Sequence, residues 1–261
     1  MFILIDFIKQ MKMNRDLIFH LVLSDLKSKT SRTYLGLLWW VADPVLYMLI
    51  FYVLVHLILD RGGPNYPAFL FVGLIPLKWT ISCLVDSVTS ISSKSRIIQQ
   101  IYVPKVIFVV VRLLVNTVKF IISMFVLLIF LWLYGIPVTA MFLYMPLIVI
   151  VHGFLLLTCM IYLAHLGIYV KDTKNVIQYA TRVLLYLSPI LYSIESVPRT
   201  LVWWIYVNPV TTLIISYRNI FLYQSDVQWG GLAVLSILSL IAFYLGLMLL
   251  ARYDKQYAKV I

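Results

Sequence analysis

Long apolar runs dominate this sequence and decide what the chain can fold into. They cover residues 34–59, 67–89, 106–134, 141–170 and 230–251. A helix needs about 20 apolar residues to cross the hydrocarbon core of a bilayer, so each run is long enough to span. Apolar residues make up 63% of the chain and the mean hydropathy is +0.99, which is more apolar surface than one soluble core can bury. The sequence predicts an all-α integral membrane protein without a soluble catalytic domain.

The segment before the last run has a less regular pattern. Residues 176–194 form a weaker apolar run that contains Arg182 and Pro189, and residues 200–222 form two apolar halves separated by Asn208-Pro209. Proline lacks a backbone N–H and disfavours helix at the residue before it. We expect 176–194 to be a further span, the fifth along the chain and one of six in all. Residues 200–222 are expected to be a re-entrant hairpin on the outer side, between spans five and six.

Basic residues support this topology, because cytoplasmic loops carry the Lys and Arg excess. With six spans, fifteen of the 21 Lys and Arg residues fall on one side and three on the other. We therefore expect one transmembrane domain, 1–261, with both termini cytoplasmic: residues 1–33 as tail and interface helix, 34–251 as six spans and 252–261 as a second tail. A seventh span at 200–222 would place the basic C-terminal tail outside and spoil this asymmetry.

Residues 14–29 form an amphipathic segment before the first span. Leu17, Ile18, Leu21 and Leu26 can share one helical face, while basic and serine side chains can face lipid headgroups. This pattern predicts an amphipathic helix lying on the inner membrane surface. The alternative is a partly disordered basic tail.

Motifs for catalysis are missing. No glycine is followed by lysine, so the sequence lacks the phosphate loop of a nucleotide hydrolase, and it contains neither H-E-x-x-H nor G-x-S. Cys83 and Cys159 lie inside apolar runs and give neither a disulfide framework nor a metal-ligand spacing. We expect no catalytic residue, no metal and no cofactor on this chain.

Ionisable residues inside apolar runs are candidates for function by default. For His56, His152 and His165 we favour a neutral imidazole bonded between helices or near a headgroup over a functional role. Lys78 and Lys119 lie deeper in their runs. A lysine facing a wet cavity could contact an anionic substrate, but a lysine that reaches an interface or a carboxylate explains the same pattern.

Short motifs along the chain resemble one known family. Residues 32–44 read RTYLGLLWWVADP at the start of the first span, with the motif residues Arg32, Tyr34, Gly36, Trp39 and Pro44. Further matches, in the family's order, are Tyr66-Pro67, Gly73–Pro76, Lys171–Lys174, Ser188–Tyr192, Asn208-Pro209 and Tyr217-Arg218. Together they resemble the permease subunits of ABC-2 type polysaccharide exporters. Two departures are Asp43, where relatives often have Asn, and Leu77-Lys78, where an aromatic residue is common.

The resemblance implies a permease half-subunit of an ATP-driven exporter in the bacterial cytoplasmic membrane. Two copies would pair, and two copies of a separate cytoplasmic subunit would bind ATP and Mg²⁺. The cargo would be a lipid-linked polysaccharide such as wall teichoic acid, O-antigen or capsule, and nucleic acid is not an expected partner. The alternatives are an ion-coupled transporter, which needs a buried acidic relay, and a membrane-embedded transferase acting on lipid-linked sugars, which should show clustered carboxylates.

Aromatic residues could guide such a cargo, because rings stack on the C–H faces of sugars. Trp40, Tyr47 and Phe51 recur on one face of the first span, and Tyr186 and Tyr192 flank Pro189. We therefore assign a substrate conduit to Trp40, Tyr47, Phe51, Tyr186 and Tyr192. The alternative is an interfacial aromatic belt with ordinary helix packing.

The loop of residues 91–104 mixes polar and apolar side chains in a way that suits docking to a partner. A short helix of this kind can insert apolar side chains into a groove while its charges meet a polar rim. Relatives of the family use the corresponding loop to bind the ATPase. The predicted coupling residues are Lys94, Arg96, Ile97, Ile98, Ile101 and Tyr102. The alternative is a solvated loop without a partner.

Overall fold

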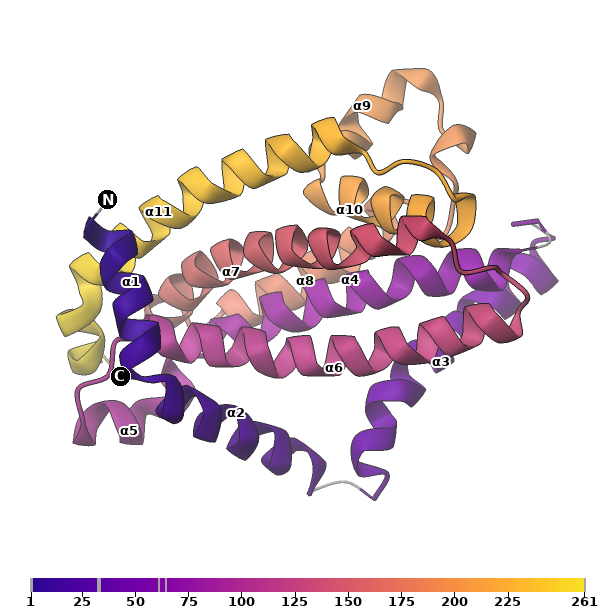
Figure 1. The fold of residues 1–261 in the computed structure, drawn as a ribbon. Coiled ribbons are helices and arrows are strands. Elements are labelled where there is room, and N and C mark those ends of the chain that lie inside the picture. Colours follow the sequence, from indigo (N-terminus) through magenta and orange to yellow (C-terminus); the bar gives the residue numbers. More distant parts are fainter. Residues whose placement is uncertain (1, 32–33, 61, 64, 261) are drawn as a thin grey trace.

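The computed structural model describes residues 2–31, 34–60, 62–63 and 65–260, and every regular element in these ranges is a helix. The longest helices form one bundle (Figure 1). Five helical stretches are long and apolar enough to cross a membrane: Gly36–Ile58, Tyr66–Val88, Val106–Leu133, Ala140–Tyr169 and Trp229–Asp254. They correspond to the five long apolar runs of the sequence, and the chain is a multi-pass membrane protein.

Helix α4 (Tyr66–Val88) is the centre of the bundle, because other long helices surround it. Its neighbours are α3 (Trp39–Phe51), α6 (Val106–Leu133), α7 (Met145–Tyr169), α8 (Thr173–Leu187) and α10 (Pro209–Arg218). Most α4 side chains are buried, as expected for a helix that is apolar around its whole circumference. Gly73 lets α10 approach closely: a Cβ there would lie 3.0 Å from Nη2 of Arg218.

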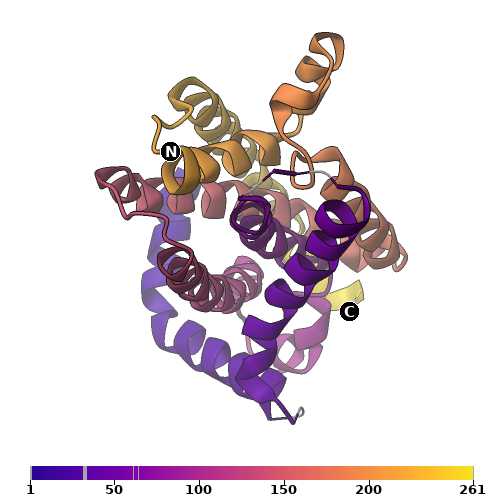
Figure 2. The ribbon, with the colours of Figure 1, turned by 90° about the vertical axis from the view of Figure 1, so that its right-hand side faces the viewer.

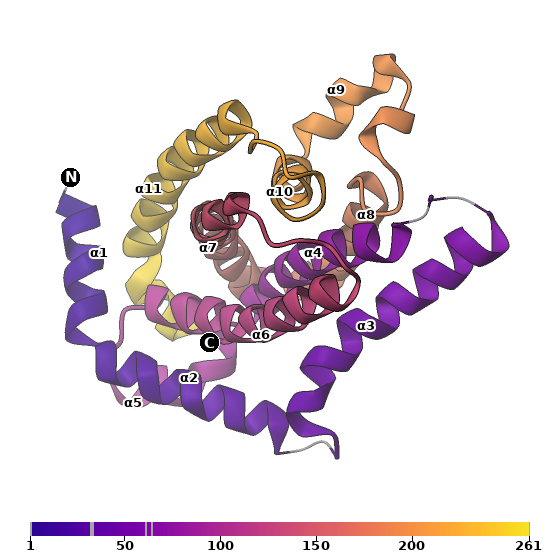
Figure 3. The same ribbon diagram turned by 45° about the vertical axis from the view of Figure 1, so that its right-hand side comes forward.

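Helix α3 lies at the edge of the molecule, away from α7 (Figure 3). It follows the short helix η1 (Gly36–Leu38) and continues as the π-helical turn η2 (Tyr52–Ile58). Its outer face exposes Leu46, Leu49, Ile50, Val53, Leu54 and Leu57. This apolar face is suited to contact with lipid or with another chain.

The segment between α7 and α11 (Trp229–Val260) is broken into short helices. After α8 come η5 (Ile194–Ser196), α9 (Arg199–Val207), α10 and η6 (Asn219–Tyr223). The break at Asn208-Pro209 agrees with the sequence: Pro209 begins α10, and Oδ1 of Asn208 accepts a hydrogen bond from the Val210 N–H at 3.0 Å. Viewed along the bundle, α9 projects from it (Figure 2).

Helix α8 ends at Leu187, earlier than the predicted span over 176–194. Ser188 is extended and Pro189 cannot continue the hydrogen-bond ladder, so the helix stops after 15 residues. The described residues therefore contain five helices of spanning length, where we expected six spans. The sixth crossing and the outer hairpin stay predictions.

The two chain ends lie at the same end of the bundle as α5 (Ser95–Gln100), and α9 lies at the opposite end (Figure 1). Helix α1 (Phe2–Met13) packs on α11, where Phe7 meets Phe243 edge to face at 5.3 Å. Helix α2 (Arg15–Thr30) covers the predicted amphipathic segment and packs on α6, with Ile18 and Leu21 buried. The segment is thus helical, and its position on a membrane surface stays a prediction. The remaining short helices are η3 (Ser92–Lys94) and η4 (Ala140–Tyr144).

Candidate functional site

A groove in the bundle brings together residues from α2, α3, α4, α6 and α8. It encloses about 690 Å³, and we call it the central groove. Its aromatic lining residues are Tyr47, Phe51 and Tyr186, and its charged ones are Lys29, Lys78, Asp86, Lys119 and Arg182. Rings of this kind can stack on sugar faces, and cations can hold anionic groups. The groove therefore combines two means of holding a charged sugar chain.

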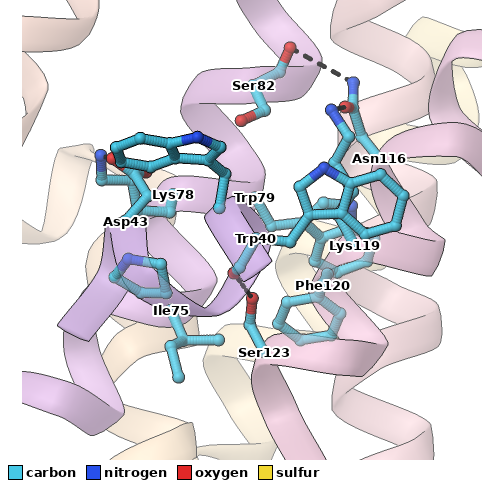
Figure 4. A pocket seen from close by; sticks show the side chains of 12 residues that line it. Trp40, Asp43, Ile75, Lys78, Trp79, Ser82, Asn116, Lys119, Phe120 and Ser123 are labelled. Carbon is cyan, nitrogen blue, oxygen red and sulfur yellow. Dashed lines mark hydrogen bonds and ion pairs between the residues drawn. The ribbon is translucent and has the colours of Figure 1, made fainter. Parts of the chain in front are cut away.

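A second cavity of about 330 Å³, which we call the tryptophan pocket, adjoins the central groove (Figure 4). The two share Lys78, Ser82 and Lys119. The tryptophans that line the pocket are Trp39, Trp40 and Trp79. Trp79 stacks on Phe120 with ring centroids 4.2 Å apart, and Oγ of Ser123 donates a hydrogen bond to the Trp40 carbonyl at 3.0 Å. These contacts tie α3 and α4 to α6 on either side of the pocket.

The two positions that depart from the family pattern contact each other. Nζ of Lys78 on α4 lies 2.9 Å from Oδ2 of Asp43 on α3. The same ammonium lies 3.3 Å from the centre of the Tyr47 ring, which is close enough for a cation–π interaction. Lys78 thus reaches a neighbouring carboxylate, which was one of the two alternatives for this residue. The pair also joins the predicted conduit ring Tyr47 to α4.

A second charged group lies between α2, α4 and α6. Nζ of Lys29 donates to Asp86 at 2.8 Å, and Nδ2 of Asn116 donates to the same carboxylate at 3.2 Å. Nζ of Lys119 donates to Oδ1 of Asn116 at 3.4 Å and lies 5.7 Å from the Trp40 ring. We call Lys29, Asp86, Asn116 and Lys119 the charge cluster. Lys29 was not predicted at this position, although Asp86 lies in the apolar run 67–89 and a carboxylate there indicates a nearby cation.

A third polar contact joins the helices at the end that holds the termini. Asp25 of α2 is buried and pairs with Lys94 at 2.7 Å and with Arg112 of α6 at 3.1 Å. Arg112 also donates to Oγ of Ser93 at 3.1 Å. Lys94, one of the predicted coupling residues, is therefore bound within this chain, at the start of α5.

The other coupling residues differ in their exposure. Ile98 is 7% exposed and packs in this chain's own core, and Ile97 is half-buried, whereas Ile101 is 53% and Tyr102 76% exposed. Arg96 is also exposed. The Tyr102 hydroxyl donates to Asp254 at 2.9 Å, and this hydrogen bond raises the pKa of the phenol because it stabilises the protonated form. A surface for a partner can thus be formed by Arg96, Ile101 and Tyr102.

The predicted conduit residues do not all share one cavity. Tyr47, Phe51 and Tyr186 line the central groove, and Trp40 lines the tryptophan pocket. Tyr192 lines neither cavity, and its hydroxyl donates to the Leu187 carbonyl at 3.4 Å.

The motif at the start of the first span serves several structural purposes. Trp39 and Pro44 line the tryptophan pocket, and Tyr34 is fully exposed. Gly36 has a φ of +47°, a left-handed conformation that glycine adopts without strain, where the chain turns into η1. Arg32 lies outside the described residues.

Arg218 was missed as a key residue, although it belongs to a quoted motif. It is 3% exposed, and its guanidinium donates to the carbonyl oxygens of Pro189, Ile190 and Phe69, the last two at 3.0 and 3.3 Å. The Tyr66 hydroxyl donates to the next carbonyl, that of Leu191, at 2.9 Å. Side chains far away in the sequence therefore satisfy the carbonyls of the irregular residues that follow α8.

The buried histidine fits the packing interpretation. His152 is fully buried, and its Nε2 shares a hydrogen bond of 2.9 Å with Thr80. No group of three potential metal ligands occurs in the part of the chain that the structure describes.

The fold and the grooved bundle define a multi-pass, all-helical membrane protein with a charged, aromatic groove between its helices. The sequence profile of the ABC-2 type transporter family matches residues 16–222, so the chain belongs to that family. It is 26% identical over 257 residues to the O-antigen export system permease protein RfbA of Klebsiella pneumoniae, covering 97% of this chain and 99% of the relative. The O-antigen export system permease protein RfbA of Myxococcus xanthus is 24% identical over 222 residues, covering 84% of this chain and 85% of the relative. The polysialic acid transport protein KpsM of Escherichia coli is 22% identical over 237 residues, covering 88% of this chain and 90% of the relative.

Proposed function

We propose that this chain is the permease half-subunit of an ATP-driven exporter that moves a lipid-linked polysaccharide, of the O-antigen, capsule or wall teichoic acid type, across the bacterial cytoplasmic membrane. The central groove carries this proposal, because Tyr47, Phe51 and Tyr186 line it together with several cations. A stack of rings can hold a sugar chain weakly at many points and still let it slide. The names of the relatives support the same cargo class.

The proposed topology has six crossings with both termini cytoplasmic. The structure has five helices of spanning length, an odd number, and both termini lie at one end of the bundle. This arrangement supports one more crossing in the segment from 170 to 228. Helix α8 and the irregular residues after it make this crossing, and α9 with α10 forms the outer hairpin. The basic residues then orient the protein, since fifteen of them lie on the side of the termini. Helix α2 lies at the inner surface.

A second copy of the chain pairs through α3 and α8. Both helices carry unpartnered apolar faces, and that of α8 exposes Val176, Tyr179, Val183, Tyr186 and Leu187. Because both helices also line the central groove, pairing there would enclose it between two copies. Two copies of a separate ATPase dock on α5 and supply the nucleotide site, for which this sequence has no motif.

Reconstitution tests the proposed function. The chain is copurified with an ATPase that carries a phosphate loop, placed in proteoliposomes, and supplied with lipid-linked glycan on the outside. We expect ATP-dependent appearance of glycan in the lumen, and none when the phosphate-loop lysine of the ATPase is replaced by alanine. Movement driven by an ion gradient without ATP would favour an ion-coupled transporter. Transfer of the sugar to a new acceptor by the chain alone would favour a transferase.

A further inference from the structure

The central groove contains more positive than negative charge. Its cations are Lys29, Lys78, Lys119 and Arg182, and its carboxylate is Asp86. Asp43 neutralises Lys78 from the adjoining pocket, at 2.9 Å. Asp86 forms its ion pair with Lys29 at 2.8 Å. Lys119 and Arg182 are then left without a carboxylate within ion-pair distance among the described residues.

Lys119 is the more informative of these two cations. It is half-buried and lines both cavities, and its hydrogen bond goes to the neutral amide oxygen of Asn116. The ammonium groups of Lys29 and Lys119 repel each other and share the attraction of one carboxylate, Asp86. A partly buried charge without a full counter-charge is costly in a medium of low dielectric constant. The charge cluster therefore favours the arrival of one more anionic group.

Arg182 brings a further cation from another wall of the groove. It projects from α8, and its guanidinium lies 5.3 Å from the centre of the Tyr179 ring. An arginine offers a planar fork of donors that fits phosphate oxygens, and lysine adds a compact charge. Ser82, which lines both cavities, supplies a hydroxyl donor.

We propose that Lys29, Lys119 and Arg182 form a binding site for the phosphate group that joins the glycan to its lipid carrier, an inference that rests on the proposed function. The groove volume of about 690 Å³ is of the size that holds a phosphorylated sugar. Tyr47, Phe51 and Tyr186 line the same groove, so the first sugars can lie on rings while the phosphate lies on cations.

The site is tested by binding measurements on the complex of this chain and its ATPase in nanodiscs. The probes are a short polyprenyl diphosphate, inorganic diphosphate and carrier-free glycan. Lys119→Gln and Arg182→Gln should each weaken polyprenyl diphosphate binding at least about tenfold, the loss typical of a charged hydrogen bond. Asp86→Asn should tighten it, because this change removes the competing carboxylate and keeps the side-chain shape. Lys174→Gln, an exposed residue of α8 outside the groove, is the matched control and should have no effect. Thermal unfolding is recorded for each variant.

Opposite effects of Lys119→Gln and Asp86→Asn are the signature of an anion site. Equal weakening by both, or normal binding by Lys119→Gln, would overturn the proposal and leave the cluster a packing feature. Inorganic diphosphate that binds as tightly as polyprenyl diphosphate would overturn the lipid-linked assignment, as would glycan binding that depends on Lys119. ATP-driven export by the wild-type complex is scored separately. If the wild-type complex exports glycan but Lys119→Gln binds polyprenyl diphosphate normally, only the phosphate site is refuted. If the variants bind polyprenyl diphosphate as predicted but the wild-type complex does not export glycan, only the exporter function is refuted.

Discussion

The guanidinium of Arg218, on α10, donates a hydrogen bond to the carbonyl oxygen of Pro189, two residues after α8 ends. It also bonds the carbonyl of Ile190 at 3.0 Å and lies 3.4 Å from the centre of the Phe69 ring of α4. One buried side chain therefore joins α4, α10 and the end of α8. The position of α10 relative to α4 and α8 depends on this residue.

Replacing Arg218 with methionine should lower the stability of the protein. The change leaves the carbonyls of Pro189 and Ile190 without donors, at an expected loss of about 2–4 kcal/mol. Arg218→Lys should lose less, because one ammonium keeps some of these bonds. Thermal unfolding in detergent measures both, with Arg199→Met, at an exposed position of α9, as the control. A melting temperature of Arg218→Met equal to that of Arg199→Met would contradict this role.

Gly73→Ala should disturb the packing of Arg218 against α4. The new methyl group would lie 3.0 Å from Nη2 of Arg218 and 3.3 Å from Cδ1 of Ile190, so one of them must move. We expect a loss of about 1–3 kcal/mol, as for other overpacked cores. Gly230→Ala in α11 is the control, because nothing lies within 4 Å of its Cβ position. Thermal unfolding compares the two variants. Equal melting temperatures would mean that the α4–α10 contact accommodates the new methyl group without loss of stability.

Ile101→Asp should release the ATPase subunit without unfolding the permease. Ile101 is exposed beside α5, so a carboxylate there costs little in this chain but opposes docking in an apolar groove. We expect at least a tenfold weaker association in copurification. Ile98→Asp should instead lower the thermal stability of the permease itself, because Ile98 is buried in its core. Full recovery of the ATPase with stable Ile101→Asp would place the docking surface elsewhere.

Tyr47→Ala and Phe51→Ala should impair export and leave the permease folded. Both rings line the central groove and lie on the poorly buried α3, so their removal leaves a smaller packing defect than the roughly 3–5 kcal/mol of a buried Phe. Phe51→Trp should keep export, because it keeps a stacking surface. Trp132→Ala, at an exposed aromatic residue of α6 that lines neither cavity, is the control. Full export by both alanine variants would end the conduit assignment for α3.

Cysteine labelling should place the two ends of the bundle on opposite sides of the membrane. Gln256→Cys, at an exposed position near the C-terminus, should react only with a reagent that reaches the cytoplasm. Arg199→Cys, exposed on α9, should react with an impermeant reagent added to intact cells. Labelling of both positions from the same side would rule out the six-crossing topology.

Local sequence patterns predicted the spans and the helix break, because both depend on neighbouring residues. The five apolar runs became helices, and Asn208-Pro209 divides α9 from α10 as its chemistry requires. The end of α8 was misplaced by seven residues, since the apolar run continues past Pro189 to residue 194. The helix ends before Pro189, and Arg218 and Tyr66 bond the carbonyls that follow; such distant partners leave no local pattern.

The site was harder to predict because its contacts are distant in sequence. Lys29 and Asp86 are 57 positions apart, and Lys94 and Asp25 are 69 apart. Composition and periodicity indicated that charges in the spans need partners, but they could not say which ones. Helical periodicity also could not show that Ile98 of the coupling loop faces the chain's own core while Ile101 is exposed.

Because Asp43 and Lys78 are in contact, we expect a change at one of these positions to be accompanied by a change at the other. A chain that acquires only the lysine carries an unpaired cation beside the Tyr47 ring, and a chain that acquires only the aspartate carries an unpaired anion beside α4. An unpaired charge within a membrane span is costly. A chimera that takes its first span from a relative with Asn at position 43 would therefore also need that relative's residue at position 78.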